Sequence, residues 1–570
     1  MRAMTGWEGD RLELAGRRRV RRYAVPQRMI DECTAARERG DWRLACEAGD
    51  IVADFESPDE AGLFADALAG FAPDLLRWHA PRAADFTASV APGLDLVLTP
   101  DRPFGPDTAV LAVRTPPELP DPFEMRLPYG NQRMRLRIRR AGELEPHRAV
   151  WLAPHQWDAR RAGDLRTAIG GDDRRIPFFE PDGSPRAQAL LGSGDDRPAR
   201  TERAWLTRRS GATWAEAGLL SDTPPPVGQR SDAGMPTMTA IVDPLRLAAE
   251  ARRLGHQTRR PVWIVRYERR HVLAVTVQGD TVTAATVEWD DVLDPRPRLH
   301  PAQVEFSADL ALLRHGRLTP GELHPLVREA LFPQDPAVPP PATVLPSERV
   351  RVRCQGDWHD LHHHAGRLTI PAHTDAEHQR EKALRAFGGT SSGCFGAAHV
   401  WAGATGRLPK RLYTVRRDLW HRIWHGGTDA VLELLDAGLD PMIRDRSGRT
   451  LLHMMGSFDH ERLLPRLLLS GADVNARERD GRTPLVRAIE QRWALSIVEA
   501  LAEAGADPHV EMEDDPWADA PSPQTLLTWL TGSSSSWFWK SDYHPEALAI
   551  LQAHAVSGST TPAGPGAGAG

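Results

Sequence analysis

The sequence predicts an α+β multidomain protein in which mixed α+β regions precede a C-terminal all-α solenoid of about four helix-turn-helix units. The chain has 570 residues, which is more than a single hydrophobic core can use. Stretches of helical periodicity alternate with strand-like stretches through the first three quarters of the chain. A period of 33 residues then begins, which is typical of stacked repeats.

Composition indicates a soluble globular protein. Hydrophobic residues make up 41% and charged residues 26% of the chain, which are ordinary values for folded domains. No apolar run reaches the ~18 residues of a membrane-spanning helix, and the basic N-terminus lacks the apolar core of a secretion signal. The four cysteines are too few for a disulfide framework. We therefore expect a cytoplasmic protein that needs no cofactor.

Charge is distributed unevenly along the chain. Residues 411–556 carry 15 basic and 22 acidic groups, a net charge of −7, whereas the other residues carry 56 and 55, a net charge of +1. Nucleic-acid binding needs a basic footprint, so we consider nucleic acid an improbable partner. Four arginines alternate with apolar residues between 133 and 139. They form either a phosphate-binding row or a solvated strand face.

The N-terminal part divides by its periodicity. Residues 1–22 are expected to be a basic disordered arm and residues 23–80 a helical unit. Residues 81–153 are interpreted as a β-meander, because short apolar runs lead into alternation with a period of two. Within it, 123–127 and 134–138 are predicted to form a β-hairpin.

The next segments differ in composition. Residues 154–240 are rich in Gly, Pro, Asp and Arg and are expected to be irregular. Residues 241–332 are predicted to form an α+β unit in the order helix, hairpin, helix. Residues 333–347 are a Pro-rich linker, 348–405 a small α+β segment and 557–570 a disordered tail.

An internal repeat is the strongest pattern in the sequence. Gly438, Gly471 and Gly505 are separated by 33 and 34 residues, and an alanine or leucine and then an aspartate follow each. The tripeptide Gly-Arg-Thr at 448–450 recurs at 481–483. Glycine supplies the positive φ that ends one helix, and threonine caps the start of the next. Each period is therefore predicted to be one helix-turn-helix unit.

Leucine pairs mark the buried stripe of the outer helices in these units. Leu467-Leu468 is one such pair, and Leu434-Leu435 precedes it by one period. We expect Leu468→Ala to leave a cavity costing about 2–5 kcal/mol. Thr483→Ala should remove a helix cap, at a cost of roughly 1 kcal/mol.

At these residues the chain resembles the ankyrin repeat family, whose pattern is D-G-R-T-P-L-H, two helices and then G-A-D-V-N-A. The matching stretch reads SGRTLLHMMGSFDHERLLPRLLLSGADVNARERDGRTPLVRAI. Leu451 stands where the family has proline, and Val486 where it has histidine. The resemblance covers about 411–556, closely in two central units and loosely in the opening unit and in 523–555.

The resemblance implies a protein partner that contacts the turns between repeats, called fingers, and the inner-helix surface. The finger candidates are Arg444, Asp445, Arg446, Arg477, Arg479 and Asp480. The inner-helix candidates are Trp424, Met455, Phe458 and Trp493. Exposed Trp and Arg are frequent at interfaces, although each tryptophan is alternatively a core residue.

The first functional hypothesis is therefore an interaction or scaffold protein. GC-rich codons favour Arg, Ala, Gly and Pro, which accounts for their abundance here. The layout of 23–405 in front of the repeats resembles that of proteins from GC-rich bacteria, so we expect the protein in the bacterial cytosol. The repeats at 411–556 bind either a protein partner or the chain's own N-terminal body. Residues 23–405 resemble no family with a known function.

A histidine cluster lies in the segment 348–405. Six of the 22 histidines fall within 20 residues, with Cys354 nearby. These are His359, His362, His363, His364, His373 and His378. On a strand His362 and His364 point to one face, a spacing that can chelate Zn²⁺. The segment has no C-x-x-C pair and no H-E-x-x-H helix, so solvated turn histidines are the alternative.

Cys394 follows a Gly/Ser-rich loop at 388–393 and is predicted to lie near a helix start. A helix N-terminus lowers the pKa of a thiol, and His399 is the candidate base for a nucleophilic Cys394. A buried, unreactive cysteine is the alternative. The second functional hypothesis is therefore an enzyme or effector whose site lies in 348–405 and whose repeats target or regulate it.

Overall fold

The computed structural model divides the chain into two compact units. Unit 1 comprises residues 1–118 and 132–343, and unit 2 comprises residues 119–131 and 344–570. The described residues are 7–55, 58–82, 89–116, 132–207, 214, 217–220, 242–260, 262–266, 271–288, 297–334, 347–364, 366–403, 406–512, 524–532 and 543–558. Within these residues, no helix combines the length and the apolar character that crossing a membrane requires.

The helices of unit 1 are mostly short. Four of them, α2, α6, α13 and α14, contribute to one buried core, through Ile30, Leu75, Leu312 and Val327 among others. The described helices are α1 (Trp7–Tyr23), α2 (Gln27–Glu38), α3 (Trp42–Ala48), α4 (Pro58–Gly62), α5 (Ala65–Gly70), α6 (Pro73–His79), α7 (Leu165–Ala168), α8 (Arg197–Leu206), α11 (Pro244–Thr258), α12 (Pro301–Val304), α13 (Ala308–Arg314) and α14 (Pro325–Leu331).

A five-stranded sheet in unit 1 is buried on both faces along three of its strands. The strands are β1 (Ile51–Asp54), β2 (Asp95–Thr99), β3 (Ala109–Arg114), β4 (Met134–Arg140) and β5 (Ala149–Trp151). Both faces are buried along β2, β3 and β5, whereas β1 and β4 have one solvated face. Their order is β1-β4-β3-β2-β5, with the edge strands parallel to their neighbours and the central strands antiparallel. On β3, Leu111 shares a core with α3 to α6, whereas Val110 and Ala112 share a core with α11.

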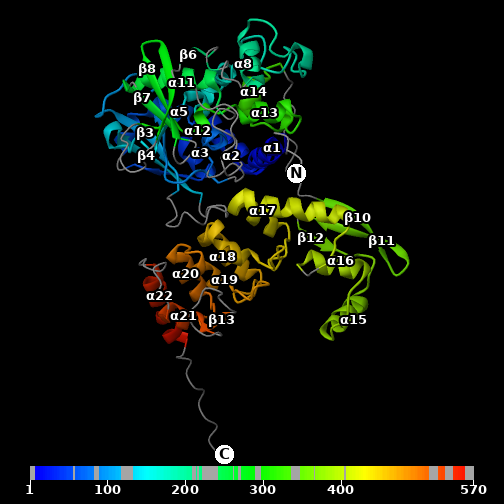
Figure 1. Ribbon diagram of the computed structural model, residues 1–570. Helices are drawn as coiled ribbons and strands as arrows, with labels where there is room; N and C mark the ends of the chain where they lie inside the picture. Colours follow the sequence, from blue (N-terminus) through cyan, green and yellow to red (C-terminus); the bar gives the residue numbers. More distant parts are fainter. Residues whose placement is uncertain are drawn as a thin grey trace, which may run out of the picture. The chain divides into compact units, whose positions relative to one another are not determined.

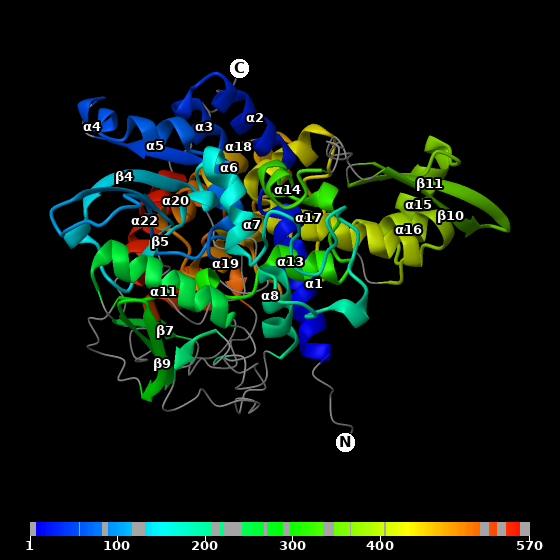
Figure 2. The same cartoon turned by 90° about the horizontal axis from the view of Figure 1, so that it is seen from above.

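A second sheet packs with α11. Its strands are β6 (Leu219–Leu220), β7 (Val262–Arg266), β8 (His271–Gln278) and β9 (Thr281–Glu288), in the order β6-β9-β8-β7. The Asp243 side chain accepts hydrogen bonds from two N–H groups of the first turn of α11. Helix α11 then crosses β8 and β9 (Figure 2), and Leu247 and Trp263 join one core.

Helix α1 (Trp7–Tyr23) occupies the described part of the region 1–22 that we predicted to be a disordered arm. Arg17 forms an ion pair with Glu305 at 3.1 Å, and Arg21 forms one with Asp309 at 2.5 Å. The acidic partners lie 288 residues further along the sequence. The sequence near α1 therefore does not show that the charges of Arg17 and Arg21 are neutralised. The prediction of an arm was wrong for this reason.

Two strand predictions also need correction. The predicted helical unit 23–80 contains β1, a four-residue strand too short to show a period of two. The predicted meander 81–153 is not sequential, because β5 crosses to the outer edge of β2. Residues 123–127 lie outside the described part, and 134–138 has β1 on one side and β3 on the other.

A buried carboxylate organises the described part of the predicted irregular region 154–240. Glu202, on α8, accepts hydrogen bonds from Arg175 at 2.6 Å, from the Phe178 N–H at 2.8 Å and from the Gly192 N–H at 2.7 Å. An unpaired buried carboxylate is costly, so these bonds fix three loop segments around α8. The irregular segments here are thus held by hydrogen bonds to one side chain of α8.

The alternating arginines of β4 lie on a solvated face. Arg133 pairs with Asp50 at 3.1 Å, and Arg137 pairs with Asp54 at 3.1 Å. These aspartates flank or end the neighbouring strand β1. The row therefore joins two strands, which agrees with the alternative of a solvated strand face rather than a phosphate site.

Unit 2 begins with a three-stranded antiparallel sheet and continues into a succession of helices. Figure 1 shows α17 to α22 in yellow to red, with the sheet and α16 beside α17. Gly427, with φ +67°, breaks α17 into two helical halves. The elements are β10 (Ser347–Cys354), β11 (Asp357–His364), β12 (Arg367–Thr369), α15 (Asp375–Ala386), α16 (Gly393–Trp401), α17 (Lys410–Asp436), the 3₁₀ helix η7 (Leu451–Ser457), α18 (His460–Leu469), α19 (Pro484–Glu490), α20 (Leu495–Glu503), β13 (Glu511–Met512), β14 (Gln524–Thr525), α21 (Leu526–Gly532) and α22 (Tyr543–Gly558).

A single hydrophobic core runs through unit 2. It includes Leu361 of β11, Trp401 of α16 and Leu412 of α17, and it continues to α22. The segments that we predicted separately, 348–405 and 411–556, therefore pack as one body. The predicted linker 333–347 and tail 557–570 lie almost wholly outside the described residues.

Candidate functional site

Buried acidic residues hold the finger turns of the two central repeats. Asp445 accepts hydrogen bonds from the N–H groups of Ser447 at 2.8 Å and Arg449 at 2.9 Å. One repeat later Glu478 is buried and accepts a hydrogen bond from Arg487 at 2.7 Å. Asp445 was a candidate for partner binding, but its carboxylate is used within its own turn.

Two arginines one repeat apart connect successive fingers. Arg444 donates to the carbonyl of Gly448 at 2.7 Å and to the carbonyl of Arg477 in the next finger at 2.6 Å. Arg477 repeats the arrangement, with 3.3 Å to the Gly481 carbonyl and 3.5 Å to that of Glu511. The sequence predicted both arginines as partner contacts. The structure gives both an internal role, and Arg477 is still exposed.

Arg446, Arg479 and Asp480 form the exposed part of the fingers, which we call the finger surface. Arg446 and Arg479 form no ion pair with any described residue. Their fingers are adjacent, because the Arg479 N–H donates to the Ser447 carbonyl at 3.1 Å. Burial is the main cause that lowers the pKa of Arg416, the charge of Asp445 raises it, and the charges of Arg479 and Arg446 lower it. The finger surface carries two arginines and one aspartate.

Three apolar inner-helix candidates are core residues. Met455, Phe458 and Trp493 are all buried. A Cβ on Gly456 would lie 2.5 Å from the Trp493 ring, so the indole packs directly on the glycine of the preceding repeat. All three side chains belong to the buried core and offer little surface to a partner, which corrects the prediction for Phe458 and Trp493.

Trp424 differs from these three. It is half-buried on α17 and packs on the core of unit 2. The Arg449 guanidinium lies over its ring, 5.3 Å from the centroid, a cation–π contact. Trp424 therefore stays a candidate contact at the start of the repeats.

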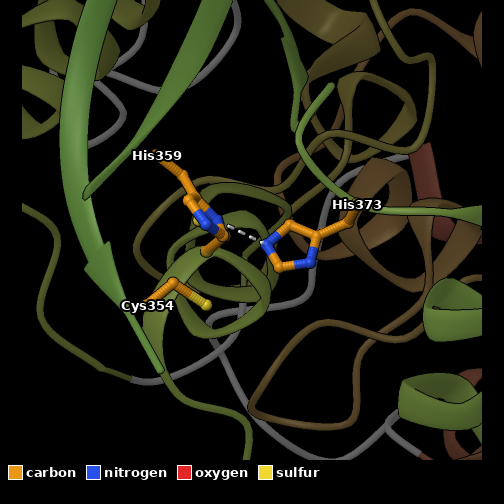
Figure 3. A group of neighbouring side chains, drawn as sticks. Cys354, His359 and His373 are labelled. Carbon is orange, nitrogen blue, oxygen red and sulfur yellow. Dashed lines mark hydrogen bonds between the residues drawn. The ribbon is translucent and has the colours of Figure 1, made fainter. Parts of the chain in front are cut away.

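Four buried or half-buried side chains meet beside the repeats, and we call Cys354, His359, His373 and Cys394 the Cys/His cluster. Their ligand-type atoms all lie within 4.8 Å of one another. His359 Nδ1 and His373 Nε2 share a hydrogen bond of 3.0 Å, drawn in Figure 3, with the Cys354 thiol pointing toward them. The Cys394 sulfur lies 3.6 Å from His359 Nδ1.

Alternate residues of β11 point to opposite faces of the sheet, and this decides which histidines reach the Cys/His cluster. On β11, His359, Leu361 and His363 share the face turned to the core, whereas His362 and His364 lie on the opposite, more exposed face. The predicted metal pair His362 and His364 is thus on the wrong face. His359 and His373 were not predicted as a pair, although the buried Leu361 marks the face of β11 to which His359 belongs.

The predicted dyad of Cys394 and His399 does not form. Arg385 donates a hydrogen bond to His399 Nδ1 at 3.0 Å, whereas the neighbour of Cys394 is His359. Burial raises the pKa of the Cys394 thiol to about 12, and the adjacent Cys354 adds to this. The predicted lowering by a helix N-terminus is therefore outweighed by loss of solvent.

Unit 1 has its own cluster of titratable groups. A cavity of about 300 Å³ is lined by His79, His155, His300 and several arginines. Burial lowers the pKa of His155 and of His300 to about 4. The lining residues Arg17 and Arg21 are paired with Glu305 and Asp309, as described above. The cavity thus combines histidines whose pKa is lowered with two arginines that are paired with carboxylates.

Comparison with known proteins identifies the repeats. Residues 419–512 match the family model described as ankyrin repeats (3 copies). An ankyrin repeat-containing protein of Schizosaccharomyces pombe is 40% identical over 72 residues, which is 13% of this chain and 35% of that protein. This chain therefore covers about a third of the length of its curated relative. Residues 419–512 are ankyrin repeats.

Proposed function

We propose that this chain is an interaction protein whose ankyrin repeats bind a protein partner through the finger surface, and that the partner presents an acidic segment there. Arg446 and Arg479, which lie on adjacent fingers and form no ion pair within the described residues, carry this proposal. Guanidinium groups bind carboxylates in a bidentate geometry, and arginine is enriched at interface hot spots.

The arginines of the outer helices provide the contrast. Arg462 on α18 pairs with Asp429 at 2.7 Å, and Arg466 pairs with Asp436. Both pairs connect successive repeats across 30 to 33 residues. The repeat region as a whole has a net charge of −7, so a positive finger surface on an acidic body gives a partner a preferred orientation.

Other elements of unit 2 pack at the two ends of the repeats. We propose that α21 and α22 cover its C-terminal end, since α22 packs against α20 and α21, and that the sheet with α16 covers the other end. Terminal repeats need such covers because they otherwise expose an apolar face. A scaffold role in the bacterial cytosol is part of this same proposal.

The test is affinity capture from native lysate with the full chain as bait, read by quantitative mass spectrometry. Arg446→Glu/Arg479→Glu should reduce capture of the specific partner by tenfold or more, because both charges that face the acidic segment are reversed. Arg444 and Arg477 stay unchanged, since reversing them would also disturb the bonds between fingers.

The matched control is Arg367→Glu/Arg380→Glu, which changes net charge equally at two exposed positions outside the repeats. Capture by this variant should equal that of the wild type. Equal capture by wild type, finger variant and control, with unaltered melting, would remove the finger assignment. A bait spanning 347–558 distinguishes a separate protein partner from unit 1 as the partner. If the repeats bind unit 1, this bait should capture unit 1 when unit 1 is added as a separate protein.

A further inference from the structure

The Cys/His cluster brings together four ligand-type side chains from four places in unit 2. Cys354 ends β10, His359 lies within β11, His373 precedes α15, and Cys394 lies in the first turn of α16. Their spacing is C-x4-H-x13-H-x20-C. Gly393 allows the last approach, because a Cβ there would lie 2.6 Å from the Cys354 sulfur.

The distances fit a tetrahedral ion. With metal–nitrogen bonds of about 2.0–2.1 Å and metal–sulfur bonds of about 2.3 Å, the tetrahedral edges are about 3.3 Å for N–N, 3.6 Å for N–S and 3.8 Å for S–S. The observed N–N distance is 3.0 Å, the observed N–S distance is 3.6 Å, and every pair lies within 4.8 Å. The N–N and N–S distances thus lie within a few tenths of an ångström of the tetrahedral edges, and all four ligand atoms are close enough to converge on one ion.

The surroundings orient one histidine for this purpose. His373 turns Nε2 toward the cluster, and its Nδ1 lies 3.8 Å from Glu377 Oε1. A carboxylate behind a metal-bound histidine selects the tautomer and strengthens the ligand. The other oxygen of Glu377 accepts the Thr374 N–H at 2.8 Å, so the start of α15 holds this carboxylate in place. The Phe395 ring also packs on His373, with 4.6 Å between centroids.

We propose that the Cys/His cluster binds one zinc ion as a structural site. Two thiolates and two imidazoles in a tetrahedron are a typical ligand set for zinc, and magnesium and calcium prefer oxygen. With four protein ligands the site is closed, which is typical of structural rather than catalytic zinc. Binding releases the two thiol protons to solvent, and both sulfurs then ligate as thiolates.

The ion would join the hairpin β10–β11, the loop before α15 and helix α16. Cys354 and Cys394 both belong to the core that continues into the ankyrin repeats. Arg416 of α17 donates to the Trp401 carbonyl at the end of α16, at 3.1 Å. Zinc is therefore expected to stabilise the cover at the N-terminal end of the repeat stack.

The experiment measures zinc bound to the full chain after expression in zinc-supplemented medium and dialysis into metal-free buffer. Elemental analysis should give about one zinc per chain. Replacing zinc by cobalt should produce the thiolate-to-cobalt charge-transfer band and the visible d–d bands of tetrahedral cobalt. The cobalt spectrum uses the unaltered chain, so it tests the site even where a cysteine variant does not fold.

Variants locate the ion. Cys354→Ser and His373→Ala should lose bound zinc, and Glu377→Gln, which keeps the acceptor for Thr374, should weaken zinc affinity about 10- to 100-fold. The control His362→Ala/His364→Ala removes two histidines from the opposite face of the same strand. It should retain zinc and the cobalt spectrum.

Three results would overturn the proposal. The first is a folded wild-type chain that retains no zinc and gives no tetrahedral cobalt spectrum. The second is a metal-free chain whose intact mass is lower by two hydrogen atoms, with Cys354 and Cys394 joined in one disulfide-linked peptide. Zinc retained equally by the cluster variants and by the control would place the ion elsewhere and would also overturn it.

Discussion

The two central ankyrin repeats differ in the contacts that hold the start of their first helix. In the first, residues 448–480, His453 Nδ1 accepts the Thr450 N–H at 3.1 Å and Nε2 donates to the Arg482 carbonyl at 3.1 Å. In the second, residues 481–512, Thr483 itself accepts the N–H of a buried Val486 at 3.4 Å. The first repeat thus depends on a polar bridge to its neighbour, and the second on apolar burial.

The helices that follow differ accordingly. Leu451 opens the 3₁₀ helix η7, which has a non-helical backbone at Met454. Pro484 occupies the first turn of α19, a regular helix in which the missing N–H is not needed. Leu451 in place of the family's proline thus coincides with an irregular 3₁₀ helix, whereas the repeat that keeps the proline has a regular α-helix.

The largest effect is expected in the outer helix of the first repeat. Leu467 is fully buried, whereas Leu468 is half-buried and Leu469 is 86% exposed. Leu467→Ala should therefore cost about 2–5 kcal/mol of local stability, instead of the Leu468→Ala change that the sequence indicated. Hydrogen exchange of the α18 amides measures this opening free energy, which suits a chain of two units.

The control for this change is Leu469→Ala, which should alter the opening free energy by less than about 0.5 kcal/mol. Leu501, fully buried on α20, occupies the corresponding place in the second repeat. Leu501→Ala should cost as much as Leu467→Ala if both outer helices are packed equally. A cost near zero for Leu467→Ala would contradict the assigned core.

The next largest effect is expected from acid, which should lower the local stability of the first repeat more than that of the second. Burial lowers the pKa of His453 to about 4, so the folded repeat excludes a proton that the unfolded chain takes up near pH 6.5. Stability is therefore full above pH 6.5 and falls as pH decreases to about 4, by up to about 3 kcal/mol. Exchange protection of η7 should decline over this range.

The matched variant is His453→Val, which gives the first repeat the residue found in the second. It should lose stability at pH 7, because the Thr450 N–H and the Arg482 carbonyl lose their partner. Its local stability should then change less between pH 6.5 and 4 than that of the wild type. An unchanged pH slope would show that another group titrates.

The arginines between fingers should give a smaller, graded effect. Arg444 makes bonds of 2.7 and 2.6 Å and Arg477 makes bonds of 3.3 and 3.5 Å. Arg444→Ala should cost about 1.5–3 kcal/mol, as for hydrogen bonds to a charged group, and Arg477→Ala clearly less. Arg446→Ala should leave stability unchanged while partner capture falls. Denaturant-dependent exchange in the fingers ranks the three variants.

Sequence reasoning succeeded where a signal is local and periodic. The 33-residue period, the turn glycines and the capping threonines predicted the repeats because each depends on neighbours within a few residues. It failed for α1, whose partner Glu305 lies 288 residues along the chain from Arg17, and for Glu202, whose partners lie 10 to 27 residues away in segments without a periodic pattern. Pairing between distant charges leaves no periodic trace in a single sequence.

The sequence pattern predicts the Cys/His cluster only in part. The alternation of Val350, Val352 and Leu361 with polar residues marks one buried strand face, and Cys354 and His359 share it. Parity therefore could have selected His359 over His362. The contributions of His373 and Cys394 depend on the placement of a loop and of α16, which no spacing rule supplied.

The smallest expected effect concerns the cap of the second repeat. Thr483→Ala removes the acceptor for the Val486 N–H, and N-cap losses cost about 0.5–2 kcal/mol. The bond is long, at 3.4 Å, and Pro484 and Val486 already pre-organise and bury the turn, so the cost should lie near the lower limit. Thr450→Ala should cost more, because it also disturbs the bonded pair of Thr450 and His453. Equal costs in the exchange of η7 and α19 would mean that the histidine bridge adds nothing to the first repeat.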